Sequence, residues 1–182
     1  MADELSIDIK NFLERDSTKS FLKAAEQFIE LVEMNTLSQQ EFYKKIFPSL
    51  VDLYSAGQKL DEIELKYSSG NTNFHNSRER FFINNNRALI SSLGQDAFYW
   101  EVFDPYVNEN DNEPTQGWLV DDFEDIYRDL KIELEIMKLG TDEAIEHALW
   151  GMKFGFVHHW GQHCISALRA LHFLWYGGQF TG

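Results

Sequence analysis

The chain has 182 residues, of which 43% are hydrophobic and 15% aromatic, so its composition fits a globular domain with a large core and excludes a disordered chain. Its formal net charge of −14 repels nucleic-acid phosphates and anionic membrane surfaces, so neither is expected as a partner. A single cysteine excludes an internal disulfide, and the acidic amino terminus lacks the apolar stretch of a signal peptide, which predicts a cytoplasmic protein.

Apolar residues recur at helical spacing between Ser17 and Met34, which predicts the first long helix. A shorter helix, from Ser6 to Glu14, falls within residues 1–16. We expect this amino-terminal segment to be loosely packed against the rest.

Ser38 and Glu41 have the spacing of a capping box, so a second helix is expected to begin there and to stop near Gly57. Pro48 lies inside it and predicts a kink. The polar residues 61–76 that follow are typical of a loop.

A third helix is predicted from Ser77 to near Gly94. An aromatic segment follows at 98–106, in which Pro105 ends any helix. Residues 107–117 read as an acidic loop. No segment of the chain shows a convincing β-strand alternation.

The fourth helix is expected from Trp118 to Lys138, where one face carries a continuous apolar stripe. Gly140 should end it and Thr141 should cap the next. That last helix, from Asp142 to about Tyr176, is apolar on nearly every side and should lie at the centre of the fold. Its three glycines indicate close helix packing or a kink that splits it in two.

These elements predict an all-α fold, an up-and-down helical bundle of five to seven helices with a central apolar carboxy-terminal helix. We expect residues 1–182 to form one helical domain.

His159 and His163 are the most unusual pair in the last helix, because residues four apart lie on one helical face and their imidazoles can share a ligand. This spacing occurs in helical metal sites, so the two histidines are the candidate ligands of a divalent metal, the only cofactor that the sequence suggests. The alternative, which the sequence alone favours, is that carboxylates or carbonyl groups satisfy the ring nitrogens and no ion binds. The Glu-x-x-His helices of di-iron proteins are absent, which argues against a di-iron centre.

The short turn between the last two helices makes them antiparallel neighbours, so carboxylates of the first can face histidines of the second. Equal rise on both sides of the turn puts His158 level with Asp122, and His159 level with Asp121. Asp122 and Asp129 flank the apolar stripe and can turn inward, whereas Asp121 lies away from it. The candidate polar cluster therefore comprises His158, His159, His163, Asp122, Asp129 and Arg169.

Arg169 joins this cluster because residues 147–182 contain no Asp or Glu, so its partner must come from elsewhere. It could form a buried ion pair, or it could bind an anionic ligand in a pocket. Cys164 is expected to be a small buried residue and not a nucleophile.

Four motifs carry a resemblance to a known family: FYWEVFDPY at 98–106, DDFEDIYRDLK at 121–131, FGFVHHWG at 154–161 with His163 after it, and ALRALH at 167–172. Together they resemble the uncharacterised bacterial family called domain of unknown function number 5063. The likeness is strong over residues 98–172 and loose over 17–97. It implies a bacterial, helical, cytoplasmic protein and brings no activity, substrate or cofactor with it.

Two functions from different classes remain. The favoured hypothesis is a non-catalytic binding or interaction domain with a protein or small-molecule partner, because no recognisable catalytic set is present. The alternative is an enzyme that binds a metal or small ligand through the His/Asp cluster between the last two helices. The sequence does not determine the oligomeric state.

Overall fold

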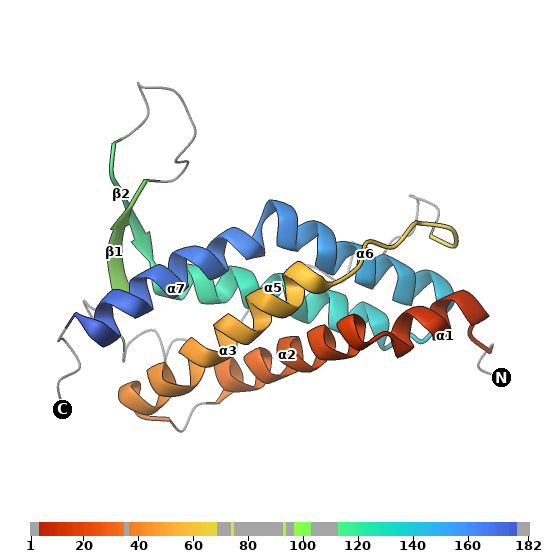
Figure 1. The fold of residues 1–182 in the computed structure, drawn as a ribbon, viewed down its shortest axis with the longest axis horizontal. Helices are drawn as coiled ribbons and strands as arrows, with labels where there is room; N and C mark the ends of the chain where they lie inside the picture. Colours follow the sequence, from red (N-terminus) through yellow and green to blue (C-terminus); the bar gives the residue numbers. More distant parts are fainter. Residues whose placement is uncertain are drawn as a thin grey trace.

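The computed structural model describes residues 4–34, 37–68, 74, 93, 97–102 and 113–177. In these ranges the chain forms helices α1 (Ile7–Glu14), α2 (Asp16–Glu33), α3 (Gln39–Lys59), α5 (Leu119–Met137), α6 (Asp142–His158) and α7 (Trp160–Tyr176) (Figure 1). Beside them stands one antiparallel strand pair, β1 (Phe98–Glu101) and β2 (Thr115–Trp118). The predicted all-α fold class is confirmed, with this small hairpin added to it.

The helix ends follow local sequence signals. The Ser38 hydroxyl accepts the Glu41 amide and the Glu41 carboxylate accepts the Ser38 amide, so the predicted capping box is present. Gly140 has a φ of 70°, which suits a glycine at the end of α5, and Thr141 caps α6 by accepting the Ala144 amide. These residues make the turn between α5 and α6 short, so the two helices lie antiparallel.

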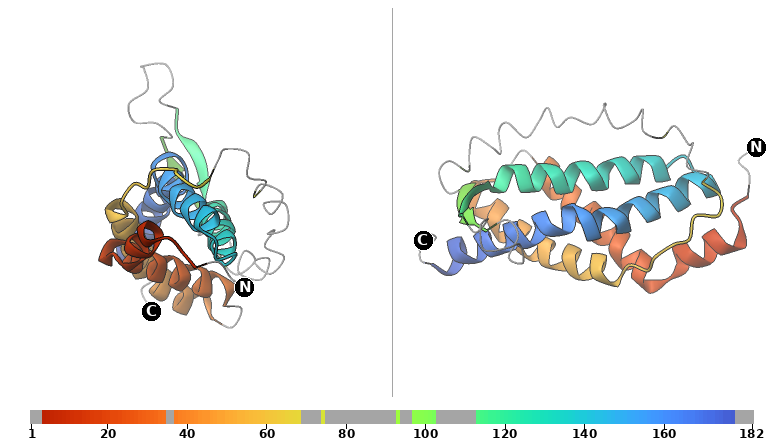
Figure 2. Two further views of the ribbon diagram at one scale, coloured as in Figure 1. Left: turned by 90° about the vertical axis from the view of Figure 1, so that its right-hand side faces the viewer. Right: turned by 90° about the horizontal axis from the view of Figure 1, so that it is seen from above.

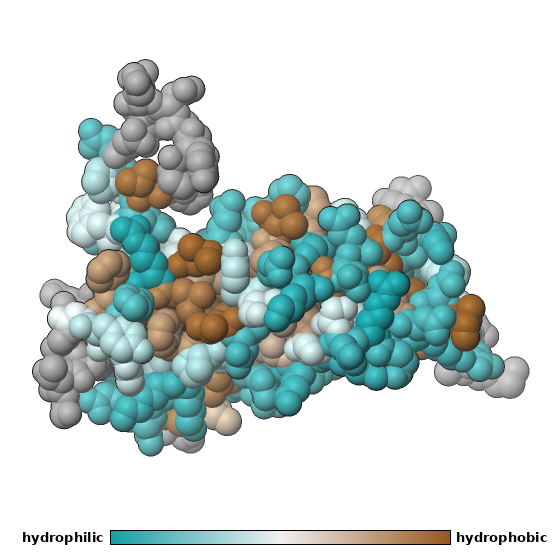
Figure 3. All heavy atoms as spheres, viewed as in Figure 1, coloured by the Kyte–Doolittle hydropathy of each residue, from teal (hydrophilic) through white to brown (hydrophobic). Residues whose placement is uncertain are grey.

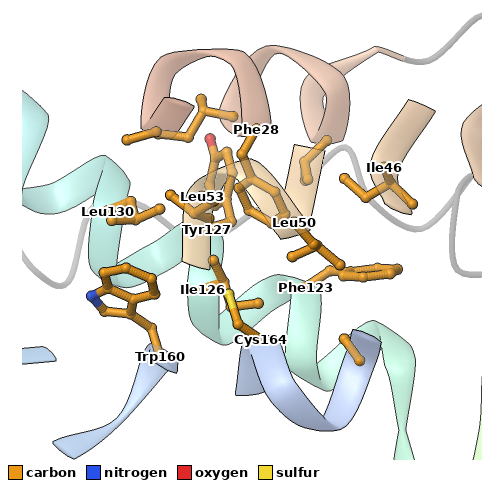
Figure 4. Packing of buried hydrophobic residues seen from close by; sticks show 14 of the residues in the cluster. Phe28, Ile46, Leu50, Leu53, Phe123, Ile126, Tyr127, Leu130, Trp160 and Cys164 are labelled. Carbon is orange, nitrogen blue, oxygen red and sulfur yellow. The ribbon is translucent and has the colours of Figure 1, made fainter. Parts of the chain in front are cut away.

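The bundle consists of α2, α3, α5 and the continuous path of α6 and α7, which lie side by side along the long axis (Figures 1 and 2). Helix α5 packs against α2, α6 and α7, and α7 also contacts α3. Their buried side chains meet in one large cluster, in which Phe28, Leu50, Ile126 and Trp160 come from four different helices (Figure 4). This packing fixes α5 against the junction of α6 and α7.

The last helix is broken at His159, whose φ of −146° and ψ of −87° are not helical. The next residue, Trp160, is fully buried, and its indole Nε1 donates to the Met152 carbonyl at 3.0 Å. A Cβ at Gly155 would lie 2.7 Å from the Trp160 ring, so this glycine leaves the space that the indole fills. Both predicted roles of the glycines occur here: Gly155 allows the close approach of the Trp160 ring, and the helix is split in two.

Helix α7 buries one side against α3 and α5, while Ile165, Phe173 and Tyr176 on its other side are exposed. Figure 3 shows hydrophobic residues gathered on this face of the molecule near α7, while most of the remainder is hydrophilic. A sequence that is apolar all round a helix therefore does not mean burial all round it.

The hairpin corrects our prediction that the chain has no β-structure. Phe98 pairs with Trp118, and their rings stack with centroids 5.9 Å apart. Residues 115–117, which we assigned to an acidic loop, form most of β2. Each strand has only four residues and both faces are partly exposed, so the apolar alternation that marks a half-buried strand does not develop.

The amino-terminal residues and the predicted loop both contact α6. In α1, Ile9 and Phe12 are buried against Ile145 and Leu149. Residues 61–68 have no helix or strand, whereas the third predicted helix, from Ser77 to near Gly94, lies almost entirely outside the described residues. None of the described helices combines the length and hydrophobicity needed to cross a bilayer.

Candidate metal centre

The carboxylates of the candidate centre come from α5. Asp122, Asp125 and Asp129 follow one another at i, i+3 and i+7, which places them along one side of the helix. That side faces the break between α6 and α7, because α5 packs against both. The carboxylates thus line up beside His159, at the break, and His163, one turn into α7.

His163 lies between two of these carboxylates. Its Nδ1 is 2.8 Å from Asp122 Oδ1, and its Nε2 is 3.3 Å from Asp125 Oδ2. The hydrogen bond to Asp122 raises the pKa of His163, and the desolvation of the half-buried ring opposes that rise. In the metal-free protein, His163 is therefore protonated more readily than an ordinary histidine.

His159 uses the same nitrogen for a second carboxylate. Its Nδ1 is 2.6 Å from Asp129 Oδ2, and its ring centroid lies 5.0 Å from that of His163. His159, His163 and Asp125 each offer one ligand atom, and the three atoms lie within 4.8 Å of one another. These three residues are the set that could hold a metal ion.

Asp122 is the buried carboxylate of the candidate centre. Its side chain is only 6% exposed, and its second oxygen accepts a 2.7 Å hydrogen bond from the Tyr99 hydroxyl of β1. Burial raises the pKa of Asp122, while hydrogen bonds from His163 and Tyr99 act in the opposite direction. Burial beside Asp122 also raises the pKa of Tyr99, so its hydroxyl stays a donor.

Asp125 is held on its other side by Arg128, which forms an ion pair with Asp125 Oδ1. The carboxylate is 14% exposed and directs Oδ2 toward His163. Arg128 thus orients the one acid that could bind an ion directly.

The structure changes the predicted cluster at two positions. His158 is exposed, and its ring lies over Phe154 with centroids 4.5 Å apart. The histidine that contacts Asp122 is His163 and not His158. His159 meets Asp129 and not Asp121. Every observed pair lies further along α6 and α7 than equal rise predicts, because side chains tilt toward the amino terminus of their own helix. In an antiparallel pair these tilts add.

Arg169 is also outside the cluster. Its side chain is exposed and lines a cleft formed with β1, so a buried ion pair is excluded. Cys164 is fully buried, and burial raises the pKa of its thiol, which confirms the expected small buried residue.

Asp125 and Tyr99 were missed. Asp125 carried a usable signal, since it stands three residues after Asp122 and four before Asp129, on the same side of the predicted helix. Tyr99 carried none, because its contact with Asp122 depends on the hairpin.

The fold and the cluster together define a helical-bundle protein with a histidine–carboxylate centre at the break of its last helix. The chain belongs to the family described as Domain of unknown function (DUF5063), whose model matches residues 13–177. It is also similar to a crystal structure of protein BF1032 from Bacteroides fragilis, with 21% identity and a TM-score of 0.69 over 91% of this chain and 96% of that one. That likeness shows the fold alone. Among curated proteins, none matches the chain.

Proposed function

We propose that this protein binds one divalent transition-metal ion, with His159, His163 and Asp125 as ligands. The observation that carries the proposal is the pairing of each histidine with its own carboxylate through Nδ1, Asp129 for His159 and Asp122 for His163. A metal-binding histidine typically donates one ring N–H to a carboxylate, which fixes the tautomer and directs the other nitrogen to the ion. Two such pairs side by side leave two Nε2 atoms as ligands.

The separation of the ligand atoms of His163 and Asp125 suits a tetrahedral ion. Two ligands that lie about 2.0–2.1 Å from a tetrahedral ion are roughly 3.3 Å apart. His163 Nε2 and Asp125 Oδ2 are 3.3 Å apart. The three ligand atoms, one of them on His159, all lie within 4.8 Å of one another.

The charge of the site also favours a divalent cation. Metal binding requires neutral imidazoles, so with an ion bound the ligand set carries the one negative charge of Asp125, and Asp122 and Asp129 add two more behind the rings. Two nitrogens and one oxygen suit zinc or iron(II), whereas calcium and magnesium prefer oxygen alone.

The competing interpretation is a purely structural pair of histidine–carboxylate contacts. Elemental analysis of the protein, purified without a histidine tag, and calorimetric titration with zinc separate the two. One zinc per chain is expected, with binding lost in His159→Ala and His163→Ala. His158→Ala is the matched control, since the adjacent exposed ring lies outside the cluster and its loss should leave binding unchanged. Equal binding in all four proteins would refute the proposed site.

A second candidate function is metal-assisted hydrolysis, supported by the number of ligands. Three protein ligands leave a position for water, as in catalytic zinc sites, and the His159 side chain is 43% exposed. Zinc-dependent cleavage of p-nitrophenyl esters that disappears in His159→Ala would support it. Stoichiometric zinc without such turnover would leave the non-catalytic binding domain that we favoured from sequence.

A further inference from the structure

A second site lies between β1 and the last two turns of α7. Here a cleft of about 280 Å³ is lined by Phe98, Tyr99, Trp100, Arg169, Ala170, Phe173 and Leu174. Its walls are mostly aromatic, and one cation stands among them. From these features we infer that the cleft binds a small carboxylate with a flat or aliphatic body, and that Arg169 holds the carboxylate group.

Arg169 is the anion-binding group of this site. A guanidinium matches a carboxylate with two parallel hydrogen bonds, which a lysine cannot do. Among the residues that the structure describes, no acid pairs with Arg169. Two acids beside the lining residues are engaged elsewhere: Glu101, next to Trp100, accepts from Ser166 at 2.7 Å, and Asp122 of α5 accepts from Tyr99 and His163.

The aromatic residues that line the cleft are the reason to expect a ligand with an apolar body. Trp100 and Phe173 are 66% and 64% exposed, which is unusual for rings that do not serve a binding surface. Phe98 is fixed by its stacking on Trp118, so that wall is preformed. The volume lies below the ~300–1,000 Å³ typical of drug-sized ligands, so the ligand is a small molecule.

The charge on the α7 side of the cleft differs from the net charge of the chain, which is −14. Anions are repelled by the chain as a whole, whereas residues 147–182, which supply Arg169 and Phe173, contain no acid. The α7 side of the cleft therefore carries a cation and no acid of its own segment.

Calorimetric or NMR titration tests this inference in protein treated with EDTA, so that the result does not depend on the metal centre. The probes are benzoate and phenylacetate, with benzamide and phenylacetamide as neutral counterparts of equal shape. We expect each carboxylate to bind about tenfold or more tightly than its amide. Arg169→Gln should abolish this preference while Lys23→Gln, which removes one exposed charge on α2, should keep it.

Phe173→Ala gives an independent readout, because this ring is exposed and its loss should not unfold the bundle. It should weaken carboxylate and amide alike. The inference is overturned by equal affinity for carboxylate and amide, by no binding of either, or by an Arg169→Gln variant that keeps the preference.

Discussion

At the scale of single residues, the central feature is that each of two histidines turns the same nitrogen to a carboxylate. His159 binds Asp129 and His163 binds Asp122, both through Nδ1. In the proposed site, the carboxylates would assign the ligand nitrogen before any ion arrives, so the centre would be preorganised. Asp122, which also accepts a hydrogen bond from Tyr99, is the more buried of the two carboxylates.

Replacing Asp122 by Asn tests this support. The amide keeps the shape but loses the charge that holds the His163 tautomer, so zinc affinity should fall about 10–100-fold. Calorimetry at pH 7.5 measures it. Asp121→Asn, at the exposed neighbouring position, is the control and should leave affinity unchanged. An unaltered affinity in Asp122→Asn would show that the contact does not support an ion.

The raised pKa of His163 predicts a pH dependence in the metal-free protein. Since the folded-state pKa lies above the unfolded value of about 6.5, the extra stabilisation from the charged His163–Asp122 pair is fully present below that pH and is lost as pH rises through the folded-state pKa. Urea unfolding with EDTA should therefore show wild type losing its stability advantage over His163→Gln above about pH 6.5. A constant difference from pH 6 to 9 would contradict this.

At the scale of elements, one buried carboxylate of α6 binds the backbone of the loop that follows α3. Glu146 is 1% exposed and accepts the amides of Lys66, Tyr67 and Ser68 at 2.7–2.8 Å. The carboxylate gives these loop amides the partners that a helix or strand would otherwise supply.

Glu146→Ala should lower the free energy of unfolding by about 2–4 kcal/mol, because it leaves three amides without acceptors. Glu146→Gln, which keeps one acceptor oxygen, should lower the free energy of unfolding by less. Urea unfolding measures both, and hydrogen exchange should quicken at residues 66–68. Glu143→Ala on the same helix is the control, and an equal loss there would remove the special role of Glu146.

Element positions were predictable where the signal was local. The capping box at Ser38, the stop at Gly140 and the cap at Thr141 each acted within a few residues and are confirmed. The hairpin was not predictable, because pairing of Phe98 with Trp118 joins distant segments. The alignment of α5 with α6 and α7 was off because it depends on side-chain tilt, which residue spacing along the helices does not contain.

At the scale of the whole molecule, charge and stability both bear on the metal centre. The net charge of −14 and the acids of α5 attract cations to the junction of α6 and α7, where α5, β1 and the broken helix meet. An ion bound there would link α5 to the junction of α6 and α7 through its ligands.

Zinc at about one hundred times its dissociation constant should therefore add about 2.7 kcal/mol to the free energy of unfolding. In a chain of this length that raises the Tm by about 5–10 °C. Calorimetric scans with zinc, with calcium and with EDTA measure the effect. A similar rise with calcium, or in His163→Ala, would indicate unspecific binding to acidic residues.

Nitrogen NMR of the imidazole rings tests the central claim most directly, because it distinguishes the two nitrogens of each histidine. On addition of one equivalent of zinc, the Nε2 resonances of His159 and His163 should shift to the positions of metal-bound nitrogen, while their Nδ1 atoms remain protonated and His158 is unchanged. Unchanged Nε2 resonances in both rings, or coordination through Nδ1, would contradict the account.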